Sequence, residues 1–441
     1  AEGQIKVWDG LMGQDWIADE MSKYEHEYCD YRDIKVLVCS WNIDASKPTD
    51  LERSHDAAKF LRLWFTSTES PDIIVIGFQE IIDLESKKQT AKTILTKKKV
   101  EKQNTANLTQ RYKAWHDKLV KAVREHATGG EQYEVISSDH LVGLFTCIFV
   151  KKSERKYIDH IDVAMKKTGL KGYHGNKGSI ATRFVYKDSS ICFVNCHLAA
   201  GQAQIKERNT DVGNILDNTE FPLRAVDESI FVHGGDGTMI SDHEICFLSG
   251  DLNYRIDMPR EDVLKAVKKK DYALLFEHDQ LYRQFQRNPG FRLRAFSEGR
   301  PDFAPTYKYN PGEDQYDTSE KKRTPAWCDR ILYRAPNIEQ EHYKRYECNV
   351  SDHKPISGAF KLSIKTILKD KRCEVEEEVA RAWGKNVEKE KFKIKEKFLK
   401  SCGFEHKMIN KTLKETNGNL RKAFDLLKNN GTDERVRRKR N

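Results

Sequence analysis

Several features that define other protein classes are missing from this sequence of 441 residues. No stretch approaches about 18 consecutive apolar residues, the length that a membrane-spanning helix needs. The sequence begins at Ala1 without a methionine or the apolar run of a signal peptide, so we expect an excised piece of a longer protein. A G-x-x-x-x-G-K-[ST] loop is also absent, which argues against a nucleoside triphosphatase.

The ten cysteines include no C-x-x-C pair, so the closely spaced ligands of a structural zinc site are missing. Several lie inside apolar runs, as Cys39, Cys147 and Cys246 do, where a thiol packs as a small hydrophobic group. No serine or cysteine nucleophile with a dedicated base is evident in the sequence. We therefore expect a reduced, cytoplasmic protein whose cysteines are mostly structural.

Positive charge is concentrated at the end of the chain. The whole sequence has 77 Lys and Arg against 68 Asp and Glu, whereas residues 361–441 alone have 24 against 13, a net charge of +11. The remainder has a net charge of −2, although a nuclease is expected to have a basic body. The basic end is either a solvated tail or a means of binding acidic membrane surfaces. The second alternative predicts a peripheral location on cytosolic membrane faces.

Short apolar runs recur through the first 360 residues, and 38% apolar residues are enough to bury a core. The runs are rich in Val, Ile, Phe and Cys, which predicts buried strands. They are Ile34–Trp41, Asp72–Phe78, Leu141–Val150, Ile191–Cys196 and Ile245–Leu248. Helical patterns lie between them, over Leu51–Phe65, Leu108–His126 and Gln202–Leu216. This alternation predicts an α/β architecture with a mixed sheet, and the polar residues 86–106 predict an exposed insertion or a disordered loop.

After Phe360 the composition becomes charged and poor in strand-forming residues. Residues 364–390 are predicted to be a charged linker or an exposed helix. Residues 391–430 contain three short helical segments with shared apolar positions, which predicts a small three-helix bundle. Residues 431–441 form a basic tail that includes Arg435, Arg437, Arg438, Lys439 and Arg440.

Polar side chains follow the predicted strands at six places. They are Asn42, Glu80, His197, Asp251 with Asn253, Asp329, and Asp352 with His353. Sites of α/β proteins lie at the carboxyl ends of strands, and six such clusters together are hard to explain by structure alone. Asn and Glu offer hard oxygen ligands suited to Mg²⁺ or Mn²⁺, whereas Asp and His pairs suit the activation of water. The set predicts metal-assisted hydrolysis of a phosphate ester by water.

Seven motifs built around these residues resemble the signatures of the inositol polyphosphate 5-phosphatases, and most closely the synaptojanin-like branch. They are SWN at 40–42, GFQE at 77–80, GNKGSI at 175–180, NCHLAAGQ at 195–202, SGDLNYRI at 249–256, TPAWCDRIL at 324–332 and SDHKPI at 351–356. The resemblance covers residues 30–363. It implies a DNase I-like, four-layer sandwich of two mixed sheets flanked by helices, of the endonuclease, exonuclease and phosphatase class. It also implies Mg²⁺-dependent removal of the 5-phosphate from phosphatidylinositol 4,5-bisphosphate and related soluble inositol phosphates.

The resemblance implies a role for each matching residue. Asn42 and Glu80 would hold the metal, and Asp352 is a further candidate ligand. Asp251 would position or deprotonate the attacking water, and Asn253 would bind the scissile phosphate. His353, oriented by Asp329, would stabilise that phosphate or serve as the base instead of Asp251, and the sequence leaves both versions open. His197 would contact the phosphoryl oxygens near the leaving group.

Cations are expected to bind the remaining phosphates of the substrate. Lys177 follows Asn176 in the GNKG segment, whose glycines would permit close approach of a phosphate. The resemblance assigns the 4-phosphate to a second set of side chains and adds Arg255 to the substrate-binding residues. The second set is Tyr307, Lys308, Lys321 and Arg323.

Two flanking segments carry shorter resemblances. Gly3–Asp9 is similar to the closing strand of a tryptophan-aspartate β-propeller blade, so residues 1–29 are either the end of an upstream propeller or a chance strand. Residues 391–430 are similar to ubiquitin-associated (UBA) domains, which implies ubiquitin as a partner; a plain helical bundle is the alternative. Two other functions stay open for the chain: a nuclease or phosphodiesterase of the same fold, and a scaffold that binds ubiquitin or membranes.

Overall fold

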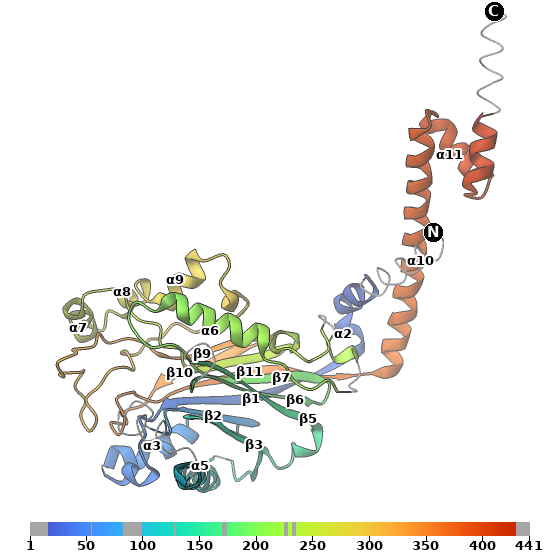
Figure 1. The fold of residues 1–441 in the computed structure, drawn as a ribbon. Helices are drawn as coiled ribbons and strands as arrows, with labels where there is room; N and C mark the ends of the chain where they lie inside the picture. Colours follow the sequence, from blue (N-terminus) through green and yellow to red (C-terminus); the bar gives the residue numbers. More distant parts are fainter. Residues whose placement is uncertain are drawn as a thin grey trace, which may run out of the picture. The chain divides into compact units, whose positions relative to one another are not determined.

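The computed structural model describes residues 16–53, 55–82, 99–127, 129–169, 174–224, 228–231 and 235–428. The chain divides into two compact units: residues 30–366, and a second unit whose described residues are 16–29 and 367–428. The first unit contains the sheets and the motifs described above (Figure 1).

The first sheet has six strands in the order β10-β11-β1-β2-β4-β3. Strands β1 and β2 are parallel, and the remaining pairs described for this sheet, β2 with β4, β3 with β4 and β10 with β11, are antiparallel. The bounds are β1 Cys29–Asn42, β2 Ile73–Gln79, β3 Tyr133–Leu141, β4 Leu144–Lys151, β10 Glu339–Arg345 and β11 Ile356–Ile367.

The second sheet has five strands in the order β5-β6-β7-β8-β9. Its central pair, β7 and β8, is parallel, and its other neighbours are antiparallel. The bounds are β5 Ile158–Gly169, β6 His174–Tyr186, β7 Ser189–His197, β8 Ile245–Asp251 and β9 Asp329–Arg334.

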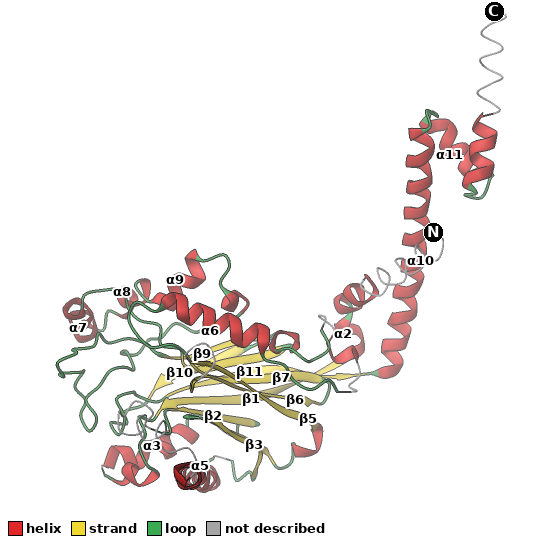
Figure 2. Ribbon diagram, viewed as in Figure 1, coloured by secondary structure: helices red, strands yellow, loops and turns green. Residues whose placement is uncertain are grey.

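The two sheets pack face to face, and helices cover their outer faces. Along β1, Val36 and Val38 join an apolar cluster shared with the second sheet, whereas Leu37 and Cys39 join a cluster with α3 (His55–Phe65) and α5 (Lys99–His126). Because successive strand residues point to opposite faces, a strand covered on both sides reads as one continuous apolar run. Helix α6 (Ile205–Asn218) covers the second sheet in the same way (Figure 2). The predicted four-layer, DNase I-like sandwich is thereby confirmed.

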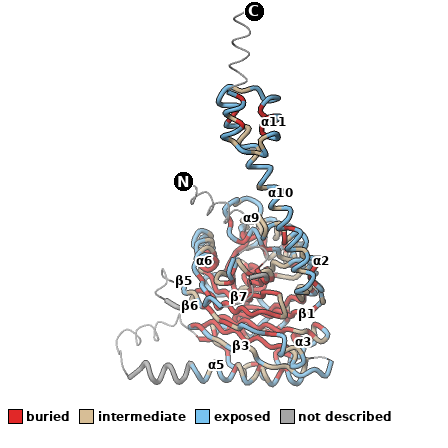
Figure 3. Tube along the Cα trace, turned by 90° about the vertical axis from the view of Figure 1, so that its right-hand side faces the viewer, coloured by how far each residue is buried: buried red, intermediate tan, exposed pale blue. Residues whose placement is uncertain are grey.

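Buried residues follow the strands through the middle of the sandwich (Figure 3). Between β8 and β9 the chain forms three short helices, α7 (Arg260–Lys269), α8 (Tyr272–Glu277) and α9 (Gln280–Arg287). Residues of α7 and α8 pack around Trp327, which belongs to the PAWCDRIL motif. This packing fixes the segment that enters β9 and the start of α9.

The structure differs from three of the local expectations. The run Leu141–Val150 is divided by the turn at Val142 and Gly143, so it belongs to two antiparallel strands. Of the expected insertion 86–106, residues 86–98 lie outside the described residues, whereas residues 99–106 belong to helix α5. The partly polar strands β3, β5, β6 and β10 have no continuous apolar run that would predict them.

The second unit is entirely helical among its described residues, apart from its junctions with β1 and β11. Helix α2 (Glu25–Tyr28) and the preceding helix at 16–23 pack against the start of α10 (Lys369–Ser401), where the rings of Trp16 and Trp383 lie 5.3 Å apart. Helix α11 (His406–Glu415), the helix at 420–428 and the end of α10 share a small core. The first helix of the predicted bundle is therefore the end of a much longer helix.

The remaining flanking predictions fall outside the described residues. Gly3–Asp9 and the basic residues from Arg435 to Arg440 belong to these parts of the chain. Among the described residues, no helix combines the length and the apolar character needed to cross a membrane.

Candidate active site

Four strands of the two sheets end at the same edge of the sandwich. Asn42 is paired with Gln79 at the end of β1 and β2, and Glu80 follows directly. In the other sheet His197 is paired with Asp251, which in turn is paired with Asp329 at the beginning of β9. Strand register therefore collects the polar residues of five separate motifs in one place. We call Asn42, Glu80, His197, Asp251, Asn253, Asp329 and His353 the reaction centre.

One half of the reaction centre has the composition of a cation site. The Asn42 Nδ2 atom donates to Glu80 Oε1 at 3.1 Å and to Asp251 Oδ2 at 3.0 Å. His197 Nε2 lies 3.3 Å from Asp251 Oδ2 and 3.5 Å from Glu80 Oε1. The ligand atoms of Glu80, His197 and Asp251 lie within 4.8 Å of one another. Two carboxylates and an imidazole at this spacing fit a divalent cation, with oxygen as the main ligand type. Asn42 presents its amide nitrogen to them, because its Oδ1 atom accepts from the Asp44 amide at 3.1 Å.

Both carboxylates of this half are held in their charged form. Burial alone would raise the pKa of Asp251, but His197, His353 and Lys177 together hold that pKa well below its ordinary value. Burial likewise opposes ionisation of Glu80, and the charges of His197 and Lys177 keep its pKa lowered. Negative charge is therefore available here for a cation or for a water that loses a proton.

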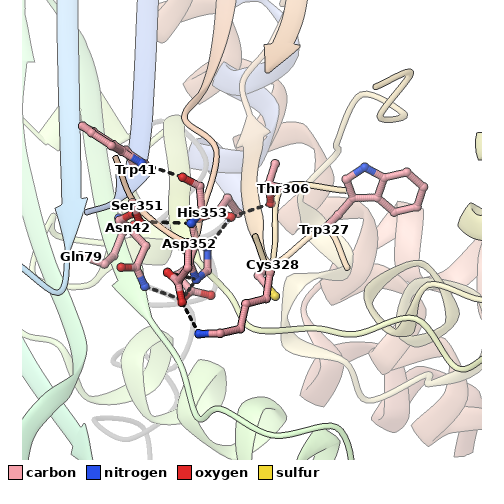
Figure 4. Close-up of polar contacts among 12 residues, drawn as sticks. Trp41, Asn42, Gln79, Thr306, Trp327, Cys328, Ser351, Asp352 and His353 are labelled. Atoms are coloured by element: carbon pink, nitrogen blue, oxygen red, sulfur yellow. Dashed lines mark hydrogen bonds and ion pairs between the residues drawn. The ribbon is translucent and has the colours of Figure 1, made fainter. Parts of the chain in front are cut away.

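The other half is a chain of hydrogen bonds that fixes His353 (Figure 4). Its Nδ1 atom lies 2.8 Å from Asp329 Oδ2, which also accepts from Thr306 Oγ1 at 2.6 Å. Trp41 Nε1 donates to the His353 carbonyl at 3.0 Å, and Ser351 Oγ accepts from the His353 amide at 3.1 Å. With Nδ1 engaged by Asp329, the Nε2 atom is the one that faces the reaction centre, 3.9 Å from Asp251 Oδ2.

His353 is charged because of this carboxylate partner. Burial would lower its pKa, but the charge of Asp329 and the hydrogen bond to it raise the pKa to about 10. Asp352, on the other side, forms an ion pair with Lys308, and its Oδ1 atom lies 3.8 Å from His353 Nε2 (Figure 4). Burial would lower the pKa of Lys308 as well, and Asp352 raises it. A buried imidazolium and a half-buried ammonium thus lie on one side of the site.

Asn253 is held in an unusual backbone conformation next to Asp251. Its φ is +57°, in the left-handed region that asparagine tolerates better than most residues. Its amide N–H donates to Asp251 Oδ1 at 3.0 Å, its Nδ2 atom donates to the Leu198 carbonyl at 3.1 Å, and its Oδ1 atom accepts from Arg255 at 2.6 Å. An amide nitrogen has two hydrogens, so one remains to donate to a substrate oxygen.

Tyr307 lies against His353, and Arg255 lies on the Tyr307 ring. The Arg255 guanidinium lies over the Tyr307 ring at 4.4 Å, and that ring lies 4.7 Å from the His353 ring. The structure thus brings Arg255, Tyr307 and Lys308 to the reaction centre, as the sequence predicted for substrate-binding residues. Their roles stay predictions.

The GNKG segment is a strand and not a loop. Lys177 and Gly178 belong to β6, and Lys177 Nζ is hydrogen bonded to His197 Nε2. Gly178 has a φ of +148°, and a Cβ there would lie 2.0 Å from the Lys166 carbonyl oxygen on β5. Packing of the neighbouring strand therefore requires this glycine. The side chain of Asn176 lies outside the described residues.

Lys321 and Arg323 lie in an exposed turn at residues 317–323, which we call the cationic turn. Asp317 is buried at its base, where its carboxylate accepts from the Ser319 amide at 3.0 Å and from the Arg323 amide at 2.7 Å. The turn is thus fixed by its backbone, and its cationic side chains extend into solvent. Among the described residues, no hydrogen bond or ion pair joins these two side chains to the reaction centre.

Comparison with known proteins identifies the fold and the family. The model of the endonuclease/exonuclease/phosphatase family 2 matches residues 39–359. The crystal structure of the inositol polyphosphate 5-phosphatase domain of SPsynaptojanin, in complex with inositol (1,4)-bisphosphate and calcium, has a TM-score of 0.66 and 31% identity, covering 86% of this chain and 98% of that chain. The chain belongs to the inositol polyphosphate 5-phosphatase family.

Curated relatives of this 5-phosphatase chain agree. A probable inositol polyphosphate 5-phosphatase of Schizosaccharomyces pombe is 44% identical over 402 residues, or 90% of this chain and 34% of the relative. The synaptojanin of Caenorhabditis elegans is 34% identical over 391 residues, or 82% of this chain and 32% of the relative. The chain spans about a third of the length of these relatives. The prediction of the family is confirmed, including its synaptojanin-like character.

Proteins with other ligands share this fold. A Cimex nitrophorin, solved as a ferrous NO complex, has a TM-score of 0.52 with 18% identity over 75% of the 5-phosphatase chain and 99% of its own. The same sandwich therefore supports unrelated ligands, and function has to be argued from the side chains at the strand ends.

Four residues that support the site from behind were missed by the sequence analysis. Thr306 precedes the predicted Tyr307, and Arg330 lies in the TPAWCDRIL motif. The pairing of Thr306 with Asp329, and of Arg330 with Asp279, could not be read from the sequence. Arg208 and Gln280 lie on helices of this 5-phosphatase chain outside the strand ends. Asp279 has a sequence signal, since an aspartate before an amphipathic helix indicates an N-cap. Gln280 has none.

Proposed function

We propose that this chain removes the 5-phosphate of phosphatidylinositol 4,5-bisphosphate and of related inositol phosphates, by Mg²⁺-dependent attack of water. The observation that carries the proposal is the meeting of two groups in one buried site. Asp251 with Glu80 provides negative charge, and His353 with Lys308 provides positive charge, within a few ångströms. A phosphate ester that is attacked by water needs both. Membership of the 5-phosphatase family supports the choice of substrate class.

Glu80 and Asp251 would hold the cation, with His197 beside them. Asn42 would join them once its amide is turned so that Oδ1, and not Nδ2, faces the carboxylates. A divalent cation bound there would neutralise charge on the phosphoryl oxygens and lower the pKa of a nearby water. Oxygen ligands favour Mg²⁺ over zinc. Asp352 is a weaker candidate ligand because its carboxylate is paired with Lys308.

Of the two versions left open for the base, the charges around Asp251 and the Asp329 partner of His353 favour Asp251. Its carboxylate is ionised, whereas His353 is an imidazolium whose Nδ1 is occupied by Asp329. An imidazolium cannot accept a proton, but its Nε2–H can donate to a phosphoryl oxygen. We therefore assign acceptance of the water proton to Asp251 and stabilisation of the phosphate to His353 and Asn253.

The substrate's other phosphates would be bound by the cations around the reaction centre. Lys177 and Arg255 are partly or fully buried and already fixed, and Lys308 is fixed by Asp352. Lys321 and Arg323 are exposed and would approach a 4-phosphate from the cationic turn. The arrangement suits a ring that carries several phosphates.

The test is phosphate release from a panel of substrates with and without Mg²⁺. We expect release from phosphatidylinositol 4,5-bisphosphate and from a soluble inositol trisphosphate, and loss of release when the 5-phosphate is absent from the substrate. Plasmid and abasic-site DNA form a second arm. Efficient nicking of DNA, or release without a 5-phosphate, would contradict the proposal.

We extend the proposal to two partners of the second unit. The basic residues beyond Lys428 would bind acidic membranes, in agreement with the net charge of +11 over residues 361–441. In the helical bundle of the second unit, the side chains of Met408 and Leu426 are 36% and 44% exposed. They provide apolar surface for a protein partner such as ubiquitin. Binding of ubiquitin to the chain, and its loss in Leu426→Asp, would be measured by titration calorimetry; an unchanged affinity in the variant would reject the surface.

A further inference from the structure

The beginning of helix α9 lies in the interior, directly behind the reaction centre. Asp279 and Gln280 are 0% and 1% exposed, although both are polar. Asp279 caps the helix through the Tyr282 amide at 2.9 Å, and both its oxygens lie 3.0 Å from Arg330 NH1. Arg330 follows Asp329, the partner of His353. The N-terminal end of α9 thus places two buried polar residues, the cap Asp279 and the first helical residue Gln280, against the segments that follow the strands.

The Gln280 side chain uses all of its hydrogen-bonding capacity. Its Nε2 atom donates to the Gln202 carbonyl at 3.0 Å and to Asp257 Oδ1 at 2.6 Å. Its Oε1 atom accepts from Arg208 NH2 at 2.6 Å and from the Arg255 amide at 3.0 Å. A primary amide has two donors and two principal acceptor directions, and all four are occupied here.

Three of these partners belong to the two segments that follow β7 and β8, and the fourth, Arg208, lies on α6. Gln202 ends the segment that begins at His197, and Arg208 NH1 donates to the carbonyls of Ala199 and Gly201 in the same segment at 3.1 and 2.7 Å. Arg255 and Asp257 belong to the segment that begins at Asp251. Gln280 is therefore a direct bridge between them.

The position of Asn253 depends on both segments. Its Nδ2 atom donates to Leu198 in the first, and its Oδ1 atom accepts from Arg255 in the second. A change in the distance between the segments would break one of these bonds or turn the amide away from the substrate.

We propose that Gln280 is a positioning residue, which holds the segments after β7 and β8 in the arrangement that aims Asn253 and Arg255 at the phosphate being transferred. The proposal rests on the proposed function for its kinetic consequence. Gln280 itself does not touch the reacting atoms.

The chemistry of an amide is essential to this role. A carboxylate of the same shape could accept from Arg208 and from the Arg255 amide. It would, however, face the Asp257 carboxylate and the Gln202 carbonyl, to which it has nothing to donate. An apolar residue would leave the buried Arg208 guanidinium and the Arg255 amide without their acceptor, whereas the exposed Gln202 and Asp257 could turn to water.

The test reverses one hydrogen bond. In Gln280→Glu we expect kcat to fall about 10- to 100-fold, because small misplacements in an active site cost this much, with a smaller change in KM. Asp257→Asn alone should cost little, since an amide oxygen can still accept. In the double variant the new amide can donate to the new carboxylate, and we expect at least a tenfold recovery of kcat over Gln280→Glu.

A matched control separates positioning from stability. Lys365 and Glu244 form a buried pair at 2.6 Å, next to the opposite end of β8 from Asp251. Lys365→Met should lower the unfolding temperature and leave the kcat of the folded protein unchanged. If Gln280→Glu behaved in the same way, with a lower unfolding temperature and a kcat within about threefold of the wild type, the role would be merely structural and the proposal wrong.

The same variants keep the proposal testable if the proposed function fails. Amide hydrogen exchange of residues 199–202 should be faster in Gln280→Glu and slower again in the double variant, whether or not the wild type releases phosphate. Absence of phosphate release by the wild type would contradict the proposed function alone. Unchanged exchange in Gln280→Glu would contradict the bridge.

Discussion

The reaction centre and the cationic turn carry their charges in opposite surroundings. Asp251, Asn253 and His353 are each at most 3% exposed, and each is fixed by several hydrogen bonds. Lys321 and Arg323 are exposed on a turn that is fixed only through its backbone. Buried, preorganised charges act strongly on a transition state, whereas exposed charges are screened by water and salt. The first region should therefore govern turnover, and the second the affinity for substrate.

Removal of divalent cations should have the largest effect. Asp251 and Glu80 are both held in their charged form, so they offer two carboxylates to a cation. We expect treatment with a chelator to reduce phosphate release to background and added Mg²⁺ to restore it. In Glu80→Gln, more Mg²⁺ should be needed for half-maximal activity. Full activity of the chelated protein would contradict the assignment of this site.

Substitution within the reaction centre should come next. We expect Asp251→Ala and His353→Ala each to lower kcat by about 10²- to 10³-fold, the usual cost of removing a preorganised polar group. The control is Asp33→Ala, which removes an exposed carboxylate at the other end of the strand that carries Asn42. Undiminished turnover in either alanine variant, measured at saturating substrate, would remove that residue from the mechanism.

Substitution in the cationic turn should have a smaller effect, of a different kind. Exposed charge pairs contribute up to about 1 kcal/mol, so we expect Lys321→Ala and Arg323→Ala each to raise KM about two- to fivefold with little change in kcat. Added salt should diminish the difference. Lys322→Ala removes the same charge from the same turn and should leave KM unchanged. Equal effects of all three would mean that the turn acts only through its total charge.

Truncation after Lys428 should affect the reaction centre least of all, and its effect should depend on the form of the substrate. We expect weaker binding to acidic vesicles and slower turnover of lipid substrate, because basic residues gain about 1 kcal/mol each near an anionic surface at most. Turnover of a soluble inositol phosphate should be unchanged. Equal vesicle binding by the truncated and full chains at low salt would show that the tail is solvated charge.

The contrast of surroundings also applies to two buried histidines. His353 faces Asp329 and is charged, whereas His243 faces cations: burial and the charge of Arg183 lower its pKa to about 4. In the unfolded chain His243 takes up a proton near pH 6.5, so the free energy of unfolding should fall as the pH falls from 6.5 towards 4. The loss from this residue is at most about 3 kcal/mol.

His243→Gln keeps a hydrogen-bond donor for the Met239 carbonyl and removes the titration. Urea unfolding between pH 7 and 5 should show a shallower decline in the variant than in the wild type. Identical declines would mean that other groups dominate acid destabilisation.

The sequence could predict the strand ends of the site better than what supports them. Asn42, His197 and Asp251 directly end apolar runs, because strands covered on both faces have no polar residues until they leave the core. In strands β5 and β10, exposed residues are interspersed with buried or half-buried ones, so these strands lack such a run. Gln280 was out of reach for another reason: its four partners come from three different segments, and only the folded chain brings them together.

The terminal helices give the same lesson from another side. Apolar positions at 392–428 predicted a bundle, and a small core is present around Leu399, Ile409 and Leu413. Nothing in that local pattern indicates that the first helix begins as early as Lys369. The residues between Lys369 and the bundle are mostly charged, and charged residues are solvated equally well in an extended linker and in an exposed helix. Helix length depended on contacts with residues near the beginning of the chain.

Because α10 is one uninterrupted helix, the number of residues between its two packed ends determines the geometry of the second unit. Val379 lies in the cluster with α2 and Leu399 in the core of the bundle, 20 positions later on one helix. Such a helix advances about 1.5 Å and turns about 100° with each residue. Every inserted or deleted residue between them would swing the bundle around the helix axis as well as shift it along that axis. This stretch can therefore change its sequence freely, but it can change its length only at the expense of the direction in which the bundle points.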